Sequence, residues 1–204
     1  QVATIPTRKT VCGFREVSTR RSLGSWAALD IERQHMEGGV ARLMALSART
    51  APKATGKDFV GIKVVKGEDI NRLADAMVQH GKEAGKKNWD RDADNVRRSD
   101  AVLLISLDKP QAAGLNCGAC GFKTCAELPK PQEGTEFVGP LCAWRLIDLG
   151  IALGSAAKTA SILNADNRIM YKVGVAARKL GLIEGEVVTG IPISATGKSI
   201  YFDR

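Results

Sequence analysis

Four cysteines between residues 116 and 142 have the residue type and spacing best suited to redox chemistry. Cys117, Cys120 and Cys125 follow one another in a single Gly-containing loop, and Cys142 comes after a Pro-rich link, giving the pattern C-x2-C-x4-C-x16-C. Four thiolates are the ligand set of a 4Fe-4S cluster. Glycines beside the ligands let the backbone fold closely and aim N–H groups at the sulfurs. The spacing therefore predicts one 4Fe-4S cluster.

Zinc and disulfide bonds are the alternatives for the same cysteines. Structural zinc sites commonly pair two short C-x2-C segments, whereas three of the thiols here crowd into one loop. Disulfides belong to oxidising compartments, and nothing else in the chain indicates secretion, so close thiols favour metal binding or catalysis. The fifth cysteine, Cys12, stands alone and is interpreted as a free thiol.

A second group of reactive side chains lies between residues 49 and 58, in the sequence Arg-Thr-Ala-Pro-Lys-Ala-Thr-Gly-Lys-Asp. Pro and Gly break helix and strand patterns there, and Arg49, Lys53 and Lys57 join two threonines in a dense set of anion-binding groups. Charged donors make the stronger hydrogen bonds to phosphate. This segment, called the 49–58 loop below, is a candidate phosphate or flavin loop, and a solvated connection is the alternative.

Composition bounds the class of protein. The 204 residues suffice for one well-filled domain, and an apolar content of 44% without a run of 18 apolar residues predicts a globular chain that does not enter a membrane. The net charge is +8, but cations and acids are mixed and no aromatic residues are interleaved for stacking, which argues against nucleic acid as a partner. The charge fits an anionic cofactor or an acidic redox partner protein. An oxygen-sensitive cluster without a signal-peptide pattern predicts a cytoplasmic location.

Residues 1–29 differ in composition from the rest. They carry five cations against the single acid Glu16, with Thr and Ser between them, and are predicted to be a basic N-terminal arm. A mitochondrial-type presequence is the alternative, although Pro6 and Gly13 interrupt the segment. Residues 30–204 are predicted to form a single domain in which residues 110–142 are the cluster-binding insert.

Hydrophobic periodicity predicts the elements that position the two loops. Helices are expected over 31–48, 68–80, 143–163 and 166–180, and strands over 59–65, 101–107, 186–193 and 198–202. The segment 101–107 is continuously apolar, as a central buried strand is, and leads directly to the cluster loop. Residues 82–100 mix six cations with five acids and are predicted to be a solvated face. His80 is expected to cap the C-terminal end of its helix.

The cysteine loop carries a family resemblance. The sequence Leu-Asn-Cys-Gly-Ala-Cys-Gly-Phe-Lys-Thr-Cys-Ala, together with the 49–58 loop, resembles the bacterial and archaeal ferredoxin-domain-containing proteins of unknown function. The resemblance extends over roughly residues 31–204. It implies a 4Fe-4S cluster but no settled reaction.

Other segments resemble the nitroreductase fold, an α+β family of flavin-binding dimers. A helix runs into Ala-x-x-Ala-Pro and then a strand between Leu46 and Val65, and a Val-Val strand ends in Gly-x-Pro at Pro192. The resemblance implies a mixed sheet flanked by helices, with the cluster loop inserted, and FMN or FAD as a cofactor. The flavin phosphate would be held by Arg49, Lys53 and Lys57, helped by Arg20, Ser22 and Lys198. In the family's Arg-x-Ser-x-Arg pattern, Gly24 replaces the final Arg.

The helix expected over 143–163 is apolar on most faces and rich in small residues, which predicts burial in the core or against a second subunit. With the resemblance to a dimeric fold, it predicts a homodimer. A cluster beside a flavin could feed electrons singly to a cofactor that releases them in pairs. The predicted function is an iron–sulfur oxidoreductase or electron-transfer protein that depends on flavin. The alternative is a non-catalytic redox sensor or a small electron-relay subunit of a larger enzyme.

Overall fold

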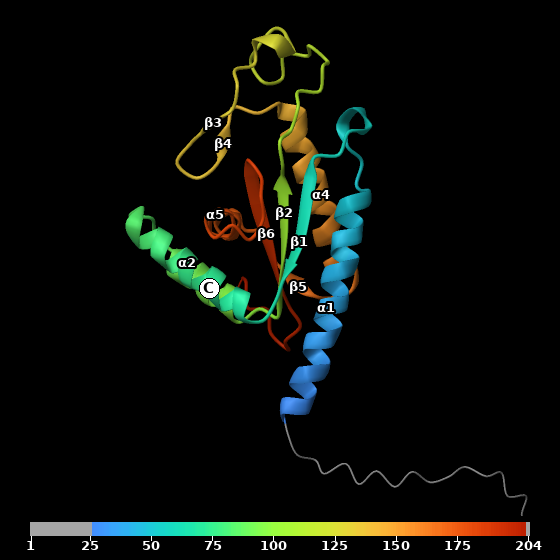
Figure 1. Ribbon diagram of the computed structural model, residues 1–204. Coiled ribbons are helices and arrows are strands. Elements are labelled where there is room, and N and C mark those ends of the chain that lie inside the picture. The colour runs from blue at the N-terminus through green and yellow to red at the C-terminus, as the bar shows by residue number, and fades with distance from the viewer. Residues whose placement is uncertain (1–25, 203–204) are drawn as a thin grey trace, which may run out of the picture.

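The computed structural model describes residues 26–202, and their side chains from residue 38 onward. The backbone forms a four-stranded sheet with helices on both faces (Figure 1). The strands are β1 (Val60–Val65), β2 (Ala101–Leu107), β5 (Asp166–Asn167) and β6 (Val187–Ser194), in the order β1-β2-β6-β5. The α+β class is confirmed. All three pairings in this sheet are antiparallel, where a mixed sheet was expected.

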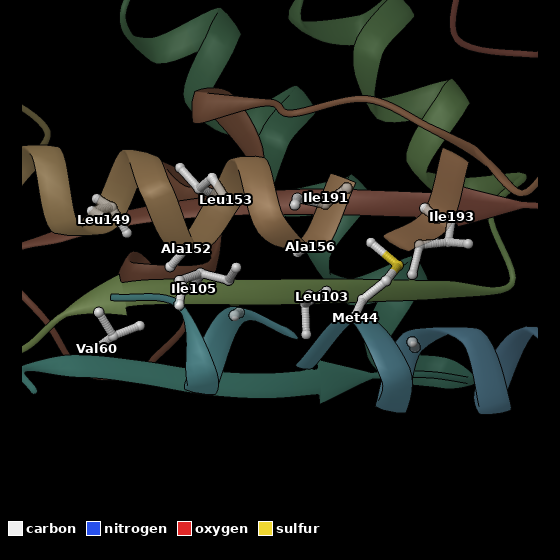
Figure 2. Packing of buried hydrophobic residues seen from close by; sticks show 14 of the residues in the cluster. Met44, Val60, Leu103, Ile105, Leu149, Ala152, Leu153, Ala156, Ile191 and Ile193 are labelled. Carbon is white, nitrogen blue, oxygen red and sulfur yellow. The ribbon is translucent and has the colours of Figure 1, made fainter. Parts of the chain in front are cut away.

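The helices divide between the two faces of the sheet. Helices α1 (Trp26–Thr50) and α4 (Ala143–Ile162) cover one face, and α2 (Glu68–Glu83), α3 (Trp89–Arg97) and α5 (Tyr171–Lys179) cover the other. Because successive side chains of a strand point to opposite faces, β2 supplies both cores. Leu103 and Ile105 pack under α1 and α4, as Figure 2 shows, whereas Leu104 packs on the opposite side. This double burial explains why every residue of the strand except Ser106 is apolar.

Small residues allow close packing around the sheet. Ala152 and Ala156 of α4 are fully buried against β2 and α1 (Figure 2). On the other face, Gly174 of α5 lies so close to β6 that a Cβ there would be 1.8 Å from the carbonyl oxygen of Val188. A residue with a side chain would have to move α5 away from the sheet.

The prediction of a solvated face over residues 82–100 was wrong. This segment contains α3, in which Trp89, Ala93 and Val96 are buried at helical spacing on one side. Most of the charges occupy the remaining faces of that helix, as in an amphipathic surface helix, whereas the buried Asp92 is paired with Arg91 and Lys172. Helix α2, predicted to end near His80, continues three residues further, to Glu83.

Two predicted elements near the C-terminus differ from the structure. Asp166 does not cap a helix but pairs with Ser194 as part of β5, and α5 begins only at Tyr171. Residues 198–202 form bends instead of a strand. The buried Tyr201 replaces strand pairing with a 2.8 Å hydrogen bond between its hydroxyl and that of Ser99.

The N-terminal boundary falls partly outside the described residues. Helix α1 begins at Trp26, so the last residues assigned to the arm are helical. Cys12, Arg20 and Ser22 lie before the described part, and the division into an arm and one domain stays a prediction. Within residues 26–202, no helix combines the length and the apolar character needed to cross a membrane.

Candidate metal centre and the adjoining loop

The cysteine loop lies at one end of the sheet, between β2 and α4 (Figure 1). After Leu107 the chain leaves the sheet and passes through the short helix η2 (Cys125–Glu127). It then forms the hairpin of β3 (Gln132–Glu133) and β4 (Val138–Gly139) before α4 begins at Ala143. The predicted cluster segment is therefore a single excursion from the end of a buried strand to the start of a long helix.

All four predicted ligands line one hollow, called the cysteine hollow below. Cys117, Cys120 and Cys125 come from the loop, and Cys142 comes from the residue before α4. None of the four forms a disulfide, and only Cys142 is buried. Among the side chains that the structure describes, no group of three His, Cys, Asp or Glu is arranged to hold a metal ion. The ligand role of the four thiols thus stays a prediction.

The loop turns tightly around the hollow. Gly118 and Gly121 have φ angles of 74° and 90°, which glycine adopts without steric cost. Asn116 supports the same turn, because its side-chain oxygen accepts a 2.8 Å hydrogen bond from the backbone N–H of Cys125. Its own N–H lies 3.4 Å from the Sγ atom of Cys125. The backbone is therefore folded so that N–H groups approach sulfur.

The environment of Cys117 favours a thiolate. Two donors to this sulfur lower the pKa of the Cys117 thiol. The backbone N–H of Ala119 has the larger effect, and the indole N–H of Trp144 follows. The Trp144 Nε1 atom lies 3.2 Å from Sγ. Thiolate is the form that binds metal, so these donors suit the thiol to a ligand role.

The hairpin that leads to the fourth cysteine is held by ion pairs. Glu133 accepts two hydrogen bonds from Arg178 of α5, at 2.5 and 2.7 Å. Glu136 binds Lys86 at 2.7 Å and the Nε2 atom of the buried His80 at 2.8 Å. Although partial burial works in the opposite direction, hydrogen bonds from Lys86 and His80 lower the pKa of Glu136. His80 therefore joins α2 to the hairpin and does not cap its helix.

A fully buried arginine ties the cysteine loop to the 49–58 loop. Arg145 donates to the carbonyl oxygens of Gln111 at 2.8 Å and of Ala54 at 2.9 Å. It also pairs with the buried Asp148 at 3.0 Å. Asp148 in turn accepts the N–H of Ala54 at 2.7 Å. Sequence reasoning missed this pair, although an Arg and an Asp three residues apart in an apolar helix were a usable signal.

Two cations of the 49–58 loop have partners within the chain. Arg49 donates to the carboxylate of Asp58 and to the carbonyl of Val60, both at 2.7 Å. Lys53 donates to the carbonyl oxygens of Ala48 at 3.0 Å and Arg49 at 2.5 Å, which stabilises the C-terminal end of α1. Both side chains are therefore engaged in fixing the loop.

The remaining predicted flavin contacts lie apart from each other. Lys57 is exposed on the loop, at the end of the sheet that carries the cysteines. Lys198 follows β6, which ends where β2 begins, so it lies beyond the opposite end of the sheet. Within one protomer the structure does not bring these two lysines together.

A second pocket of about 390 Å³ adjoins the cysteine hollow. This α4 pocket is mostly apolar, and its size is typical of small-molecule sites. It is lined by Pro52, Lys53, Ala54, Thr55, Leu115, Trp144, Ile147, Asp148 and Ile151. Leu115 and Trp144 line both spaces, so they form the boundary between the pocket and the four thiols.

Comparison with known sequences identifies the family. Residues 138–204 match the family described as "Uncharacterized protein containing a ferredoxin domain (DUF2148)". A protein of Archaeoglobus fulgidus, itself described as uncharacterized, is 52% identical over 165 residues, which cover 80% of this chain and 89% of that relative. The chain belongs to this family of ferredoxin-domain-containing proteins.

Solved structures confirm the nitroreductase-like fold. The nitroreductase CinD from Lactococcus lactis, in complex with nicotinic acid, matches with a TM-score of 0.52 at 14% identity, over 82% of this chain and 84% of that chain. The FMN-dependent nitroreductase NfnB from Mycobacterium smegmatis, in complex with NADPH, also matches with a TM-score of 0.52, at 13% identity and over 78% of each chain. At this level of identity the likeness defines the fold alone.

Proposed function

We propose that Cys117, Cys120, Cys125 and Cys142 hold one 4Fe-4S cluster and that the protein is an iron–sulfur oxidoreductase or electron-transfer protein. The observation that carries the proposal is that four free thiols line one hollow in a member of a ferredoxin-domain family. Such a cluster supplies a redox centre whose potential depends on hydrogen bonds and solvent exposure.

The chain's own residues suit this role. Three thiols come from a loop whose backbone N–H groups approach sulfur, and the fourth precedes a 20-residue helix. The N-terminal end of a helix carries a partial positive charge, which stabilises an anionic ligand held there. The ion pairs of the hairpin and the buried Arg145 fix the two segments that must converge.

Elemental analysis tests the ligand assignment. Protein purified and reconstituted without oxygen should contain about four irons and four sulfides per chain, as four thiolate ligands of one 4Fe-4S centre require. Cys120→Ser should lose most of both, because the cluster loses a ligand. Stoichiometric zinc without sulfide in the anaerobic wild-type protein would overturn the proposal in favour of a structural zinc site.

The α4 pocket supports a second cofactor, FMN or FAD. The pocket adjoins the cysteine hollow, and its size and apolar lining suit an organic ring system. The phosphate would be bound by Arg49, Lys53 and Lys57, helped by Arg20 and Ser22, and Lys198 would have to come from a second copy of the chain. Arg49 and Lys53 would exchange their present partners for the phosphate, whereas Lys57 is already exposed. A flavin would supply two-electron chemistry beside a one-electron centre.

Flavin binding can be tested on the purified protein. Chromatography of the supernatant after denaturation should reveal FMN or FAD, and titration of flavin-free protein should give saturable binding that Lys57→Ala weakens. Lys63→Ala is the matched control, since Lys63 is an exposed lysine on β1. If neither flavin binds at high micromolar concentration, the flavin assignment is wrong, and the redox sensor or electron-relay subunit becomes the better function.

The apolar surface beside the pocket supports a homodimer. Leu146, Ile147 and Ile151 of α4 are each 38–44% exposed, and Leu43 and Leu46 of the neighbouring α1 are more exposed still. An apolar surface of this kind commonly marks a protein interface. A second copy of the chain would cover it.

The proposal includes a redox partner protein, because the cluster needs an electron donor. It also includes a cytoplasmic location, because an oxygen-sensitive cluster needs a reducing compartment.

A further inference from the structure

Trp144 is placed to act on the candidate cluster without being a ligand. It is the second residue of α4, two positions after Cys142, yet its indole Nε1–H donates across the hollow to the Sγ atom of Cys117 at 3.2 Å. The residue that follows it, Arg145, is fully buried and bound to both loops. The indole is therefore held by a helix turn that the rest of the fold fixes in place.

The packing of Trp144 does not explain why the residue is a tryptophan. The side chain is 37% exposed and is not part of either hydrophobic core. Its ring lines the cysteine hollow on one side and the α4 pocket on the other. The polar edge of the ring points to sulfur, while its apolar surface separates the thiols from the pocket.

We propose that Trp144 is a positioning residue that raises the reduction potential of the cluster through its hydrogen bond to Cys117. The proposal rests on the proposed function. A donor to a cluster sulfur stabilises the reduced state more than the oxidised state, because reduction adds negative charge to the iron and its sulfurs. The backbone N–H of Asn116 donates to the Sγ atom of Cys125 and would raise the reduction potential in the same way. Only proline would remove that donor, and proline cannot adopt the φ of 48° at Asn116, whereas the indole N–H can be removed without changing the backbone.

Trp144→Phe removes the N–H and keeps an aromatic ring. We expect the iron and sulfide contents to stay unchanged. At any fixed potential, the ratio of reduced to oxidised cluster should be about tenfold lower than in the wild type. For a one-electron couple this is a shift of about 59 mV to lower potential. Only the difference in hydrogen-bond strength between the reduced and the oxidised cluster contributes to this shift, so the shift stays within what one hydrogen bond to a charged group supplies in total. Dithionite provides the electron in an anaerobic titration followed by visible absorption and by EPR of the reduced cluster.

Ile162→Ala is the matched control, because Ile162 is exposed at the far end of the same helix and lines neither the hollow nor the pocket. It should leave the potential at the wild-type value. A Trp144→Phe protein that keeps its cluster at the wild-type potential would overturn the inference while leaving the proposed function intact. A wild-type protein that takes up no iron and sulfide would instead overturn the proposed function itself.

A second measurement covers the case in which Trp144→Phe does not retain the cluster. Pulsed EPR of the reduced wild-type protein, labelled with 15N at the tryptophan indole nitrogens, should show one nitrogen coupled to the cluster spin. Trp89 lies in α3 on the opposite face of the sheet and does not line the hollow. The absence of an indole coupling would overturn the inference whatever the variant does.

Discussion

Replacing Arg145 by Met should destabilise the protein strongly, although the two side chains are similar in length and no catalytic role is assigned to the residue. Arg145 is fully buried and Asp148 nearly so, and their 3.0 Å ion pair lies between α4, the 49–58 loop and the start of the cysteine loop. Met would take the guanidinium away from the carboxylate of Asp148, which would keep its hydrogen bond from the N–H of Ala54. It would also leave the carbonyl of Gln111 without the guanidinium that it binds.

The expected cost follows from the uncompensated charge. Removing one partner of a buried ion pair typically costs about 3–5 kcal/mol. For a chain of this length each kcal/mol lowers Tm by about 2–4 °C, so we expect a decrease of roughly 10 °C. Asp148→Asn should cost a similar amount, about 3–5 kcal/mol, because it leaves the Arg145 guanidinium charged and buried, with the amide NH2 of Asn facing Arg145 where Oδ2 now accepts a hydrogen bond.

The decisive comparison is the double variant Arg145→Met/Asp148→Asn. Because the buried charge is gone, its loss of stability should be smaller than the sum of the two single losses by about 1–3 kcal/mol. Urea unfolding of metal-free, reduced protein, followed by far-UV circular dichroism, measures all three values. A loss below about 1 kcal/mol in Arg145→Met, or strict additivity in the double variant, would refute the reasoning.

Three further predictions concern other parts of the fold. Gly174→Ala should cost more than about 2 kcal/mol in urea unfolding because its Cβ meets the β6 backbone, whereas Gly150→Ala, with open space in α4, should stabilise by about 0.5–1 kcal/mol. Burial raises the pKa of Asp92, but hydrogen bonds from Lys172 and Arg91 outweigh it and lower that pKa below its unfolded value. The carboxylate therefore contributes to the free energy of unfolding above about pH 4, and this contribution is lost as pH falls through the folded pKa. Asp92→Asn should therefore be less stable than wild type at pH 7, and the gap should close in acid; a gap independent of pH between 7 and 3 would contradict this. Light scattering at micromolar concentration should give a dimer mass that Ile151→Lys reduces to a monomer mass, and a monomeric wild type would count against the proposed interface.

The sequence predicted best where one residue property decided the structure. The apolar run from Ala101 to Leu107, interrupted only by Ser106, is β2 to the residue, because a strand buried on both faces needs no alternation. The start of α4 directly after Cys142 also agrees with the prediction. In both places local composition and tertiary environment favour the same structure.

The sequence predicted poorly where distant segments decide the structure. Helix α3 was missed because its three apolar anchors are outnumbered by charges, and β5 exists because it pairs with the end of β6. The partners of Lys53 became visible only with the C-terminal carbonyls of α1 in place. Likewise the role of Arg145 depends on two loops that meet only in the folded chain.

The central claim is that four particular thiols hold one cluster, and a Mössbauer spectrum of anaerobically reconstituted, 57Fe-loaded protein tests it most directly. The account predicts the signature of a single 4Fe-4S centre in the wild type, lost in Cys142→Ser and retained in Cys12→Ser, since Cys12 is not assigned as a ligand. A wild-type cluster signature in Cys142→Ser, or loss of the cluster in Cys12→Ser, would contradict the account.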